Sequence, residues 1–259
     1  MEYCMMKLKS KTAFITGATS GIGRACALNL AQQGCRVILI GRRSERLEKL
    51  GQEIKRKYNG EWLALPLDVR NKEAVRNAID SLPEYWRDID ILINNAGMAR
   101  GVDKMQQASA ENWEQMIDTN VKGLLYVTHA LLPGMVKRQK GDIVNIGSTA
   151  GHEVYPGGNV YCATKHAVDA ITKGLRIDLV DTPLRVASVD PGMVETEFSI
   201  VRLGDEQKAK DVYSGMQPLT AHDIAETVVF ILTRPAHVQF GSVIMLPTAQ
   251  ASAMVVHRE

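Results

Sequence analysis

The chain reads Thr12-Ala13-Phe14-Ile15-Thr16-Gly17-Ala18-Thr19-Ser20-Gly21-Ile22-Gly23-Arg24 near its beginning, and this stretch decides the fold. Its apolar start predicts a strand, its glycines predict a tight turn, and residues 25–33 predict a helix that ends near Gly34. Glycine lets the backbone bend sharply and approach a pyrophosphate, whose charge is met by free N–H groups at the helix start. The order of strand, turn and helix therefore favours a dinucleotide site.

The spacing of the glycines narrows the class of nucleotide. Gly17, Gly21 and Gly23 form G-x-x-x-G-x-G, which departs from the G-x-G-x-x-G fingerprint. A P-loop ends in Gly-Lys-Ser or Gly-Lys-Thr, and Gly23-Arg24-Ala25 does not supply this ending. A nucleoside triphosphatase is therefore disfavoured. Tight turns also use glycine for steric reasons alone, so the nucleotide interpretation needs support from other parts of the chain.

The next strand predicts which dinucleotide binds. Residues 36–40 read as a buried strand that ends at Gly41-Arg42-Arg43, and a helix is expected over residues 44–57. An acid near this point binds the ribose 2′-hydroxyl of NAD, whereas a basic residue accommodates the 2′-phosphate of NADP. The acid is missing here, and an arginine–phosphate hydrogen bond of about 1.5 to 3 kcal/mol gives a roughly ten- to hundredfold preference. The sequence predicts NADP; the alternative is that both arginines are solvated residues at a helix start.

Strands and helices alternate along the rest of the chain without a linker. Further strands are expected at residues 62–67, 89–93, 142–146, 185–189 and 243–246, with one long helix over residues 110–137. This alternation predicts an α/β fold: a single Rossmann-type domain over residues 1–259, whose doubly wound parallel sheet of about seven strands carries helices on both faces. Ligands then bind at the carboxyl ends of the strands. Six motifs follow such ends, at Gly17, Arg42, Asp68, Asn95, Ser148 and Pro191.

Tyr161 and Lys165 are four residues apart in a segment that reads as helical. The spacing puts the phenol and the ammonium on one helix face. A phenol with an ordinary pKa of about 10 is protonated at neutral pH, and a fixed cation beside it favours the phenolate. The pair therefore suits acid/base chemistry in a redox reaction. The alternative is a surface Tyr and Lys on an amphipathic helix, since Y-x-x-x-K alone is unspecific.

Composition excludes several classes of partner. The net charge is +2, from 31 basic and 29 acidic side chains, so we expect neither nucleic acid nor a membrane as a partner. Cys4, Cys26, Cys35 and Cys162 form no C-x-x-C pair, so no metal site or disulfide framework is expected and a cytoplasmic location fits best. No segment reaches the roughly eighteen apolar residues of a membrane span.

Taken together, the motifs resemble those of the short-chain dehydrogenase/reductase family over essentially the whole chain. They are Thr16-Gly17-x-x-x-Gly21-Ile22-Gly23, Asn94-Asn95-Ala96-Gly97, Asn120, Ser148, Tyr161-x-x-x-Lys165 and Pro191-Gly192. Within this family the chain is most similar to the NADP-dependent 3-hydroxy acid dehydrogenases, which act on serine and allo-threonine. The narrower resemblance rests on Ile117-Asp118-Thr119-Asn120, Gly147-Ser148-Thr149-Ala150-Gly151, Gly157-Gly158-Asn159-Val160-Tyr161, Thr196-Glu197-Phe198-Ser199 and the ending from Pro235-Ala236-His237-Val238 to His257-Arg258.

The resemblance implies four catalytic residues. Tyr161 is expected to take the hydroxyl proton while hydride leaves the same carbon for the nicotinamide, and to return a proton in the reverse reaction. Lys165 is expected to lower the pKa of the phenol and to hold the nicotinamide ribose. Ser148 is expected to orient the substrate oxygen. Asn120 is expected to help keep a water that links Lys165 to solvent; alone, Ser148 also reads as a strand-end cap and Asn120 as a helix-distorting polar residue.

The resemblance also implies the residues that contact NADP, in addition to Tyr161 and Lys165. They are Gly17, Ala18, Thr19, Ser20, Gly21 and Ile22 at the diphosphate, Arg42 and Arg43 at the 2′-phosphate, Asp68 and Val69 near adenine, Asn95 near the adenosine ribose, and Pro191, Gly192, Met193, Val194, Glu195, Thr196, Glu197, Phe198 and Ser199 over the nicotinamide.

The expected substrate is a small 3-hydroxy acid such as serine, allo-threonine or 3-hydroxypropionate, with malonic semialdehyde as a substrate of the reverse reaction. Ser148 and Tyr161 would hold its hydroxyl, and Arg202 is the candidate partner of its carboxylate, the alternative being a solvated surface arginine. Two other functions stay open: a 3-oxoacyl thioester reductase of the same family, and a non-catalytic module that senses NADP. The apolar tail over residues 246–259 is expected to dock on a neighbouring subunit of a homotetramer.

Overall fold

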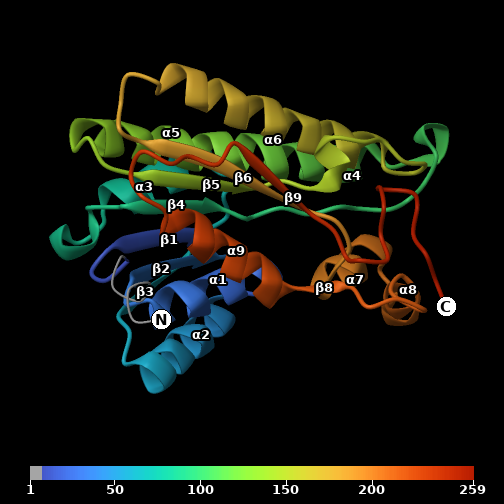
Figure 1. The fold of residues 1–259 in the computed structure, drawn as a ribbon, viewed down its shortest axis with the longest axis horizontal. Coiled ribbons are helices and arrows are strands. Elements are labelled where there is room, and N and C mark those ends of the chain that lie inside the picture. Colours follow the sequence, from blue (N-terminus) through green and yellow to red (C-terminus); the bar gives the residue numbers. More distant parts are fainter. Residues whose placement is uncertain (1–7) are drawn as a thin grey trace.

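The computed structural model describes residues 8–259, which fold around one seven-stranded parallel sheet (Figure 1). In spatial order its strands are β3 (Trp62–Pro66), β2 (Arg36–Gly41), β1 (Thr12–Thr16), β4 (Ile91–Asn94), β5 (Asp142–Ile146), β6 (Arg185–Pro191) and β9 (Ser242–Met245). The order reverses between β1 and β4, which is where doubly wound sheets bind their ligands. The predicted fold class is confirmed, including the strand number.

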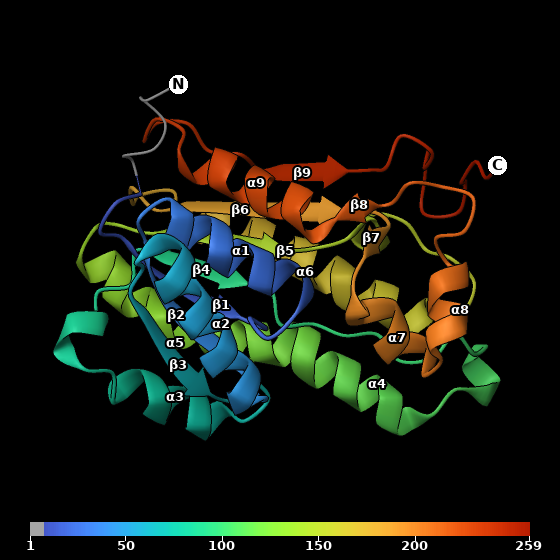
Figure 2. The ribbon, with the colours of Figure 1, turned by 90° about the horizontal axis from the view of Figure 1, so that it is seen from below.

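Helices cover both faces of the sheet, as Figures 1 and 2 show. One face carries α1 (Gly21–Gln32), α2 (Ser44–Tyr58) and α9 (Ala221–Leu232). The other carries α3 (Lys72–Asp80), α4 (Ala110–Ile117), α5 (Leu124–Lys137) and α6 (Asn159–Asp178). Beyond the carboxyl ends of the strands lie two short helices and a two-stranded pair: α7 (Glu197–Leu203), α8 (Glu206–Asp211), β7 (Val194–Glu195) and β8 (Leu219–Thr220).

The two faces have separate hydrophobic cores because successive side chains of a strand point to opposite sides. In β2, Val37 and Leu39 pack with α1, α2 and α9, whereas Ile38 and Ile40 pack with α3 and α5. All four side chains are fully buried. Burying each contributes about 1.5–3 kcal/mol, so a continuous apolar run can hold a strand between two helical layers.

The expected long helix over residues 110–137 is interrupted. The chain is helical from Ala110 to Lys137, as predicted, but a π-helical turn at Asp118–Gly123 separates α4 from α5. The buried side chain of Asn120 lies in this turn and bonds to the backbone of Met98 and to Thr164. Such turns often occur at functional sites, since the extra residue redirects a side chain.

The cysteines of the described residues are unpaired. Cys26, Cys35 and Cys162 are free and buried, and Cys4 lies outside the described residues. Burial raises the pKa of the Cys26 and Cys35 thiols to about 12, which makes them inert packing residues. Within residues 8–259, no helix combines the length and the apolar character that a bilayer crossing requires.

Candidate active site

The glycine turn between β1 and α1 is held by Asn95, the residue directly after β4. Asn95 Nδ2 donates to the carbonyl oxygens of Thr16 at 3.0 Å and of Gly17 at 3.3 Å. Gly17 has φ +67°, and a Cβ at Gly23 would lie 2.4 Å from both the Gly17 oxygen and Asn95 Nδ2. Only glycine fits either position. The side chain of Ser20 makes no capping bond, so the start of α1 can offer N–H groups to an anion.

A cavity of about 520 Å³ opens at this edge of the sheet. Its volume lies within the range of about 300–1,000 Å³ that is typical of ligand sites. All of the predicted cofactor and substrate residues line it except Ala18 and Glu195. The glycine turn, the end of β2, the end of β5, the start of α6 and the segment from β6 to α7 therefore share one hollow, as the carboxyl ends of parallel strands should.

Three predicted residues lie off the cavity wall. The Ala18 side chain is fully buried in the core, and its backbone N–H donates to the Ile40 oxygen at 2.9 Å. Glu195 is exposed in β7, opposite Thr220 of β8. Asn120 is buried behind the wall. Ala18 and Glu195 therefore do not line this cavity, and their contact with a cofactor stays a prediction.

Ser148, Tyr161 and Lys165 meet at the centre of the cavity. Ser148 follows β5 by two residues, and its hydroxyl hydrogen-bonds with the Tyr161 phenol and accepts from the Ala150 N–H at 3.1 Å. Lys165 Nζ donates to the Ile146 oxygen at 2.8 Å and lies 6.0 Å from the centroid of the Tyr161 ring. The i, i+4 spacing on α6 thus places the phenol and the ammonium on one face, as the sequence predicted.

Asn120 is buried next to Ser148, Tyr161 and Lys165 and bonds to the residues around them. Its Oδ1 accepts from the Met98 N–H at 2.8 Å, and its Nδ2 donates to the Met98 oxygen at 2.8 Å and to Thr164 Oγ1 at 3.0 Å. A Cβ built at Gly97 would lie 3.4 Å from Asn120 Oδ1 and 3.8 Å from Lys165 Nζ. The amide and the ammonium therefore flank the same glycine. The role of Asn120 in holding a water stays a prediction.

Burial shifts the acidity of both central groups. It raises the pKa of the Tyr161 phenol, which the nearby Tyr155 also raises, whereas the Ser148 hydrogen bond and the Arg202 charge lower it. Burial lowers the pKa of Lys165 to about 8, and the charge of Asp190 opposes that change. The lowering of the phenol pKa by Lys165 therefore stays a prediction, and the structure adds Ser148 and Arg202 as groups that favour the phenolate.

Arg202, the predicted partner of the substrate carboxylate, lines the cavity close to Tyr161. Its Nη1 donates to the Tyr155 hydroxyl at 3.0 Å, and its guanidinium carbon lies 5.8 Å from the centroid of the Tyr161 ring. The Arg202 Nε also donates to the Gly101 oxygen at 3.3 Å, so two hydrogen bonds fix the position of the guanidinium. A held guanidinium beside the phenol is suited to a carboxylate two bonds from a reacting hydroxyl carbon.

The opposite end of the cavity carries the two arginines of the β2 end. Arg43 donates to Thr19 Oγ1 at 2.8 Å, to Ser20 Oγ at 3.0 Å and to Glu197 at 3.1 Å. Arg46 donates to the same glutamate at 2.7 Å. No hydrogen bond or ion pair of the Arg42 side chain occurs within the described part of the chain, and that side chain lines the cavity.

Sequence reasoning missed several residues of the site. Tyr155 and Gln250 line the cavity, and the Asp190 carboxylate lies buried close to Lys165, bonded to His152 and Ser188. The sequence indicates Gln250 only weakly, as a polar residue shortly after the last apolar strand. Asp190 and Tyr155 stand next to predicted motifs, Asp190 directly before Pro191-Gly192 and Tyr155 two residues before Gly157, but their partners are distant in the chain.

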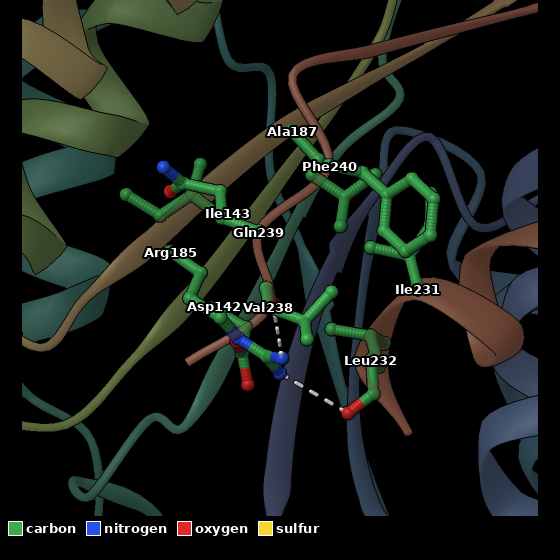
Figure 3. A pocket seen from close by; sticks show the side chains of 10 residues that line it. Asp142, Ile143, Arg185, Ala187, Ile231, Leu232, Val238, Gln239 and Phe240 are labelled. Atoms are coloured by element: carbon green, nitrogen blue, oxygen red, sulfur yellow. Dashed lines mark hydrogen bonds and ion pairs between the residues drawn. The ribbon is translucent and has the colours of Figure 1, made fainter. Parts of the chain in front are cut away.

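A second hollow, at the amino ends of β5 and β6, is structural. It measures about 10 Å³, room for about one water molecule. Figure 3 shows Arg185 reaching from β6 to the carbonyl oxygens of Leu232, at 3.2 Å, and Val238, at 3.1 Å. Its Nε also pairs with Asp142. In the part of the chain that the structure describes, no three His, Cys, Asp or Glu side chains gather closely enough to hold a metal ion.

The large cavity fits a phosphorylated pyridine dinucleotide. The glycine turn has no Cβ to block the approach of a pyrophosphate, and α1 starts with no acidic residue in its first turn. The end of β2 offers Arg42 and Arg43 and no carboxylate. The carboxylate of Asp68, on the same wall, is paired with Arg70 at 2.6 Å. The charges along this wall therefore suit a 2′-phosphate rather than a free 2′-hydroxyl.

Comparisons with known proteins agree with this geometry. Residues 11–206 match the short chain dehydrogenase family. The NADP-dependent 3-hydroxy acid dehydrogenase of Schizosaccharomyces pombe is 45% identical over 257 residues, 98% of this chain and 99% of that protein. The serine 3-dehydrogenase of Agrobacterium fabrum is 44% identical over 252 residues, 96% of this chain and 99% of that protein.

A solved structure gives the same result. The closed form of serine dehydrogenase complexed with NADP+ has a TM-score of 0.89 and 47% identity, over 96% of this chain and 100% of that chain. A likeness of this extent covers the sheet, both helical layers and the segments around the cavity. The family predicted from the motifs is therefore confirmed: the chain belongs to the short-chain dehydrogenase family.

Proposed function

We propose that the chain is an NADP-dependent oxidoreductase that transfers a hydride between the nicotinamide and the 3-hydroxyl carbon of a small 3-hydroxy acid. NADP, predicted from Arg42 and Arg43, is also the cofactor named for the 3-hydroxy acid dehydrogenase relative and for the solved serine dehydrogenase complex. One observation carries the substrate class: the guanidinium of Arg202 stands beside the phenol of Tyr161 inside the cavity.

Each residue of the centre has a distinct part in this reaction. When bound, NADP supplies the hydride acceptor for the carbon that carries the hydroxyl. Ser148 and Tyr161 bind the hydroxyl oxygen, and Tyr161 removes its proton, or returns one when a carbonyl is reduced. Lys165 keeps a positive charge next to the phenol, which favours the phenolate that proton removal requires. Asn120 fixes the backbone of Met98 and the Thr164 hydroxyl beside Lys165.

The substrate end selects for a short acid. Arg202 binds the carboxylate while Tyr155 holds the guanidinium in place, so the distance between the carboxylate and the reacting hydroxyl is set by two fixed side chains. Serine, allo-threonine and 3-hydroxypropionate all present this spacing, and malonic semialdehyde presents it in the reverse direction. We propose this set as the substrate class.

The test is a panel of short hydroxy acids run with NADP and with NAD, followed by absorbance of the reduced nicotinamide. We expect turnover of 3-hydroxy acids with NADP and a roughly ten- to hundredfold lower kcat/KM with NAD. Activity confined to long acyl thioesters would instead identify a 3-oxoacyl thioester reductase. Tight NADP binding without turnover of any substrate would identify a module that senses NADP.

We further propose that the chain forms a homotetramer in the cytoplasm and that residues 246–259 contribute to a subunit interface. Apolar side chains near this segment are exposed: Ile244 by 53%, Met254 by 61% and Val255 by 62%. β9 is also an edge strand of the sheet. Exposed apolar groups beside a sheet edge favour association. Sedimentation at micromolar concentration tests this, and a monomer there would contradict it.

A further inference from the structure

Gln250 lies where the C-terminal tail crosses the cavity wall. The residue is 5% exposed, and its Oε1 accepts from the backbone N–H of Met193 at 2.8 Å. Its Nε2 donates to the Ser252 oxygen at 3.0 Å. A Cβ built on Gly192 would lie 2.2 Å from Gln250 Oε1, so only glycine lets the amide approach the backbone this closely. Both the oxygen and the nitrogen of the buried Gln250 amide therefore make hydrogen bonds.

The segment that Gln250 holds forms the wall from β6 to α7. The Gly192 N–H donates to the Met245 oxygen at 2.8 Å, and the Met193 oxygen accepts from the Leu219 N–H at 2.9 Å. The Met193 N–H is therefore left facing the tail, and the Gln250 side chain supplies its acceptor. A buried N–H without an acceptor carries a full desolvation penalty. The bond from the Met193 N–H to Gln250 therefore stabilises the position of the segment between β6 and α7.

The far end of the tail is fastened to the residues that follow α8. Arg258 donates to the carbonyl oxygens of Ser214 at 2.5 Å and Val212 at 2.9 Å, and the Glu259 N–H donates to the Gly215 oxygen at 3.0 Å. Between the two ends, the Ala253 N–H donates to Glu153 at 2.8 Å. Val212, Gln250 and Ala253 all line the cavity. The tail therefore joins the wall after β6 to the segment after α8 within one chain.

We propose that Gln250 is a positioning residue of this site, through which the C-terminal tail holds the backbone of residues 191–196 in the form that receives the nicotinamide end of NADP. The inference rests on the proposed function only for the identity of the ligand. Gln250 acts through the Met193 N–H, so it governs the affinity for cofactor and substrate, whereas Ser148, Tyr161 and Lys165 govern the chemical step.

The experiment compares Gln250→Met with Gln250→Glu in the full-length protein. Methionine keeps the length of the side chain and removes both bonds, whereas glutamate keeps an acceptor for the Met193 N–H. We expect Gln250→Met to raise the Kd of NADPH, measured by fluorescence titration, by about five- to 150-fold, the range for an unpaired buried N–H. KM for the hydroxy acid should rise similarly, kcat should stay within about twofold, and Gln250→Glu should recover part of the loss.

Hydrogen exchange supplies a readout that does not require activity. Amides of residues 191–196 should exchange faster in Gln250→Met than in the wild type, with unchanged exchange in the core strands. Arg258→Met, which releases the far end of the tail outside the cavity, should raise the Kd of NADPH about two- to threefold. Gln52→Met, on the exposed face of α2, is the matched control and should change none of these values.

Three results would overturn the inference: an unchanged Kd of NADPH in Gln250→Met, an unchanged exchange rate at residues 191–196, or a Gln250→Glu variant with no recovery. If Gln250→Met fails to fold, Arg258→Met and the exchange at residues 191–196 of the wild type decide the question, since a protected Met193 amide is required. Failure of the wild type to bind NADPH would refute the proposed function instead, and the exchange data would still report on the Gln250 contact.

Discussion

The guanidinium of Arg202 donates to the Tyr155 hydroxyl at 3.0 Å and lies 5.8 Å from the centre of the Tyr161 ring. This arrangement brings a positive charge to the phenol from a helix outside the sheet, α7, and lowers the pKa that burial raises. The same charge is placed to bind a carboxylate. In the proposed function, Arg202 would therefore both bind the substrate carboxylate and lower the pKa of the phenol that moves the proton.

Replacing Arg202 with methionine should weaken acidic substrates selectively. Loss of a charge-assisted hydrogen bond of about 1.5–3 kcal/mol predicts a roughly ten- to hundredfold higher KM for a 3-hydroxy acid. The Kd of NADPH should stay unchanged, because the cofactor phosphates are expected at the other end of the cavity. Steady-state kinetics with the acid and with its methyl ester provide the measurement. An equal loss for both substrates would show that Arg202 does not bind the carboxylate.

Tyr161→Phe removes the proton-transfer group and leaves the ring in place. General acid–base groups typically contribute 10²- to 10⁴-fold, so kcat should fall by about that factor. Because the ring still packs against Phe198, at a centroid distance of 5.6 Å, the fold and NADPH binding should persist. Turnover and fluorescence titration measure the two effects. Near-normal turnover with intact NADPH binding would remove Tyr161 from the mechanism.

Arg42→Ala tests the cofactor assignment. The variant should lose most of its preference for NADP over NAD, by roughly tenfold or more, because one arginine–phosphate contact disappears. Its kcat with saturating NADPH should change little, since Arg42 is far along the cavity from the Tyr161 hydroxyl. Kd values for both reduced cofactors give the preference directly. An unchanged ratio would contradict the role of this loop.

Glu197 joins the start of α7 to two arginines on the opposite wall of the cavity. The Glu197 carboxylate accepts from Arg43 at 3.1 Å and from Arg46 at 2.7 Å. Of these two arginines, Arg43 lines the cavity and Arg46 does not. Arg46→Met should therefore weaken the attachment of the α7 start to this wall without removing an expected phosphate ligand. Because exposed ion pairs contribute about 0.2–1 kcal/mol, we expect release of NADPH to become about two- to fivefold faster in stopped-flow displacement.

A matched control for this ion pair exists on the neighbouring helices. Arg24→Met breaks a pair with Glu53 away from the cavity, in which the arginine is as exposed as Arg46, and should leave the release rate of NADPH unchanged. The difference between wild type and Arg46→Met should shrink as salt is raised, because screening weakens the wild-type contact. If both variants release NADPH equally fast, the contact with Glu197 has no part in retention.

Lys165→Met should make the protein more stable while removing its activity. The pKa of Lys165 is lowered to about 8 from an ordinary 10.5, so at pH 7 the fold bears the cost of a buried charge, roughly 3 kcal/mol or less. Between pH 8 and 10.5 the unfolded chain binds more protons at this lysine than the native one, so the wild type gains stability as pH rises. The excess Tm of the variant should be largest at pH 7 and should narrow above pH 8. A lower Tm at pH 7 would contradict this, because it would mean that the bond to Ile146 outweighs the buried charge.

Local patterns in the sequence were sufficient for the fold and for the centre of the site. Strand periodicity, the glycine turn and the four-residue spacing of Tyr161 and Lys165 act over short distances, and each predicted its own element. The alternation of elements then placed every motif at the same sheet edge, because parallel strands end together. Asn120 alone already read as a helix-distorting residue, but the π-helical turn at Asp118–Gly123 was not predicted, since the partners of Asn120 lie at Met98 and Thr164, 22 and 44 residues away.

The sequence by itself determined the class of fold and the choice of NADP over NAD, and it predicted the position of the cofactor site, because each follows from backbone conformation or charge within a few residues. Only the tertiary structure decided which side chains close the cavity. Tyr155 meets Arg202 across 47 residues, and Gln250 meets Met193 across 57. Such contacts depend on how the helices and the tail pack beyond the sheet edge, and burial, which sets the acidity of Tyr161 and Lys165, exists only once that packing has formed.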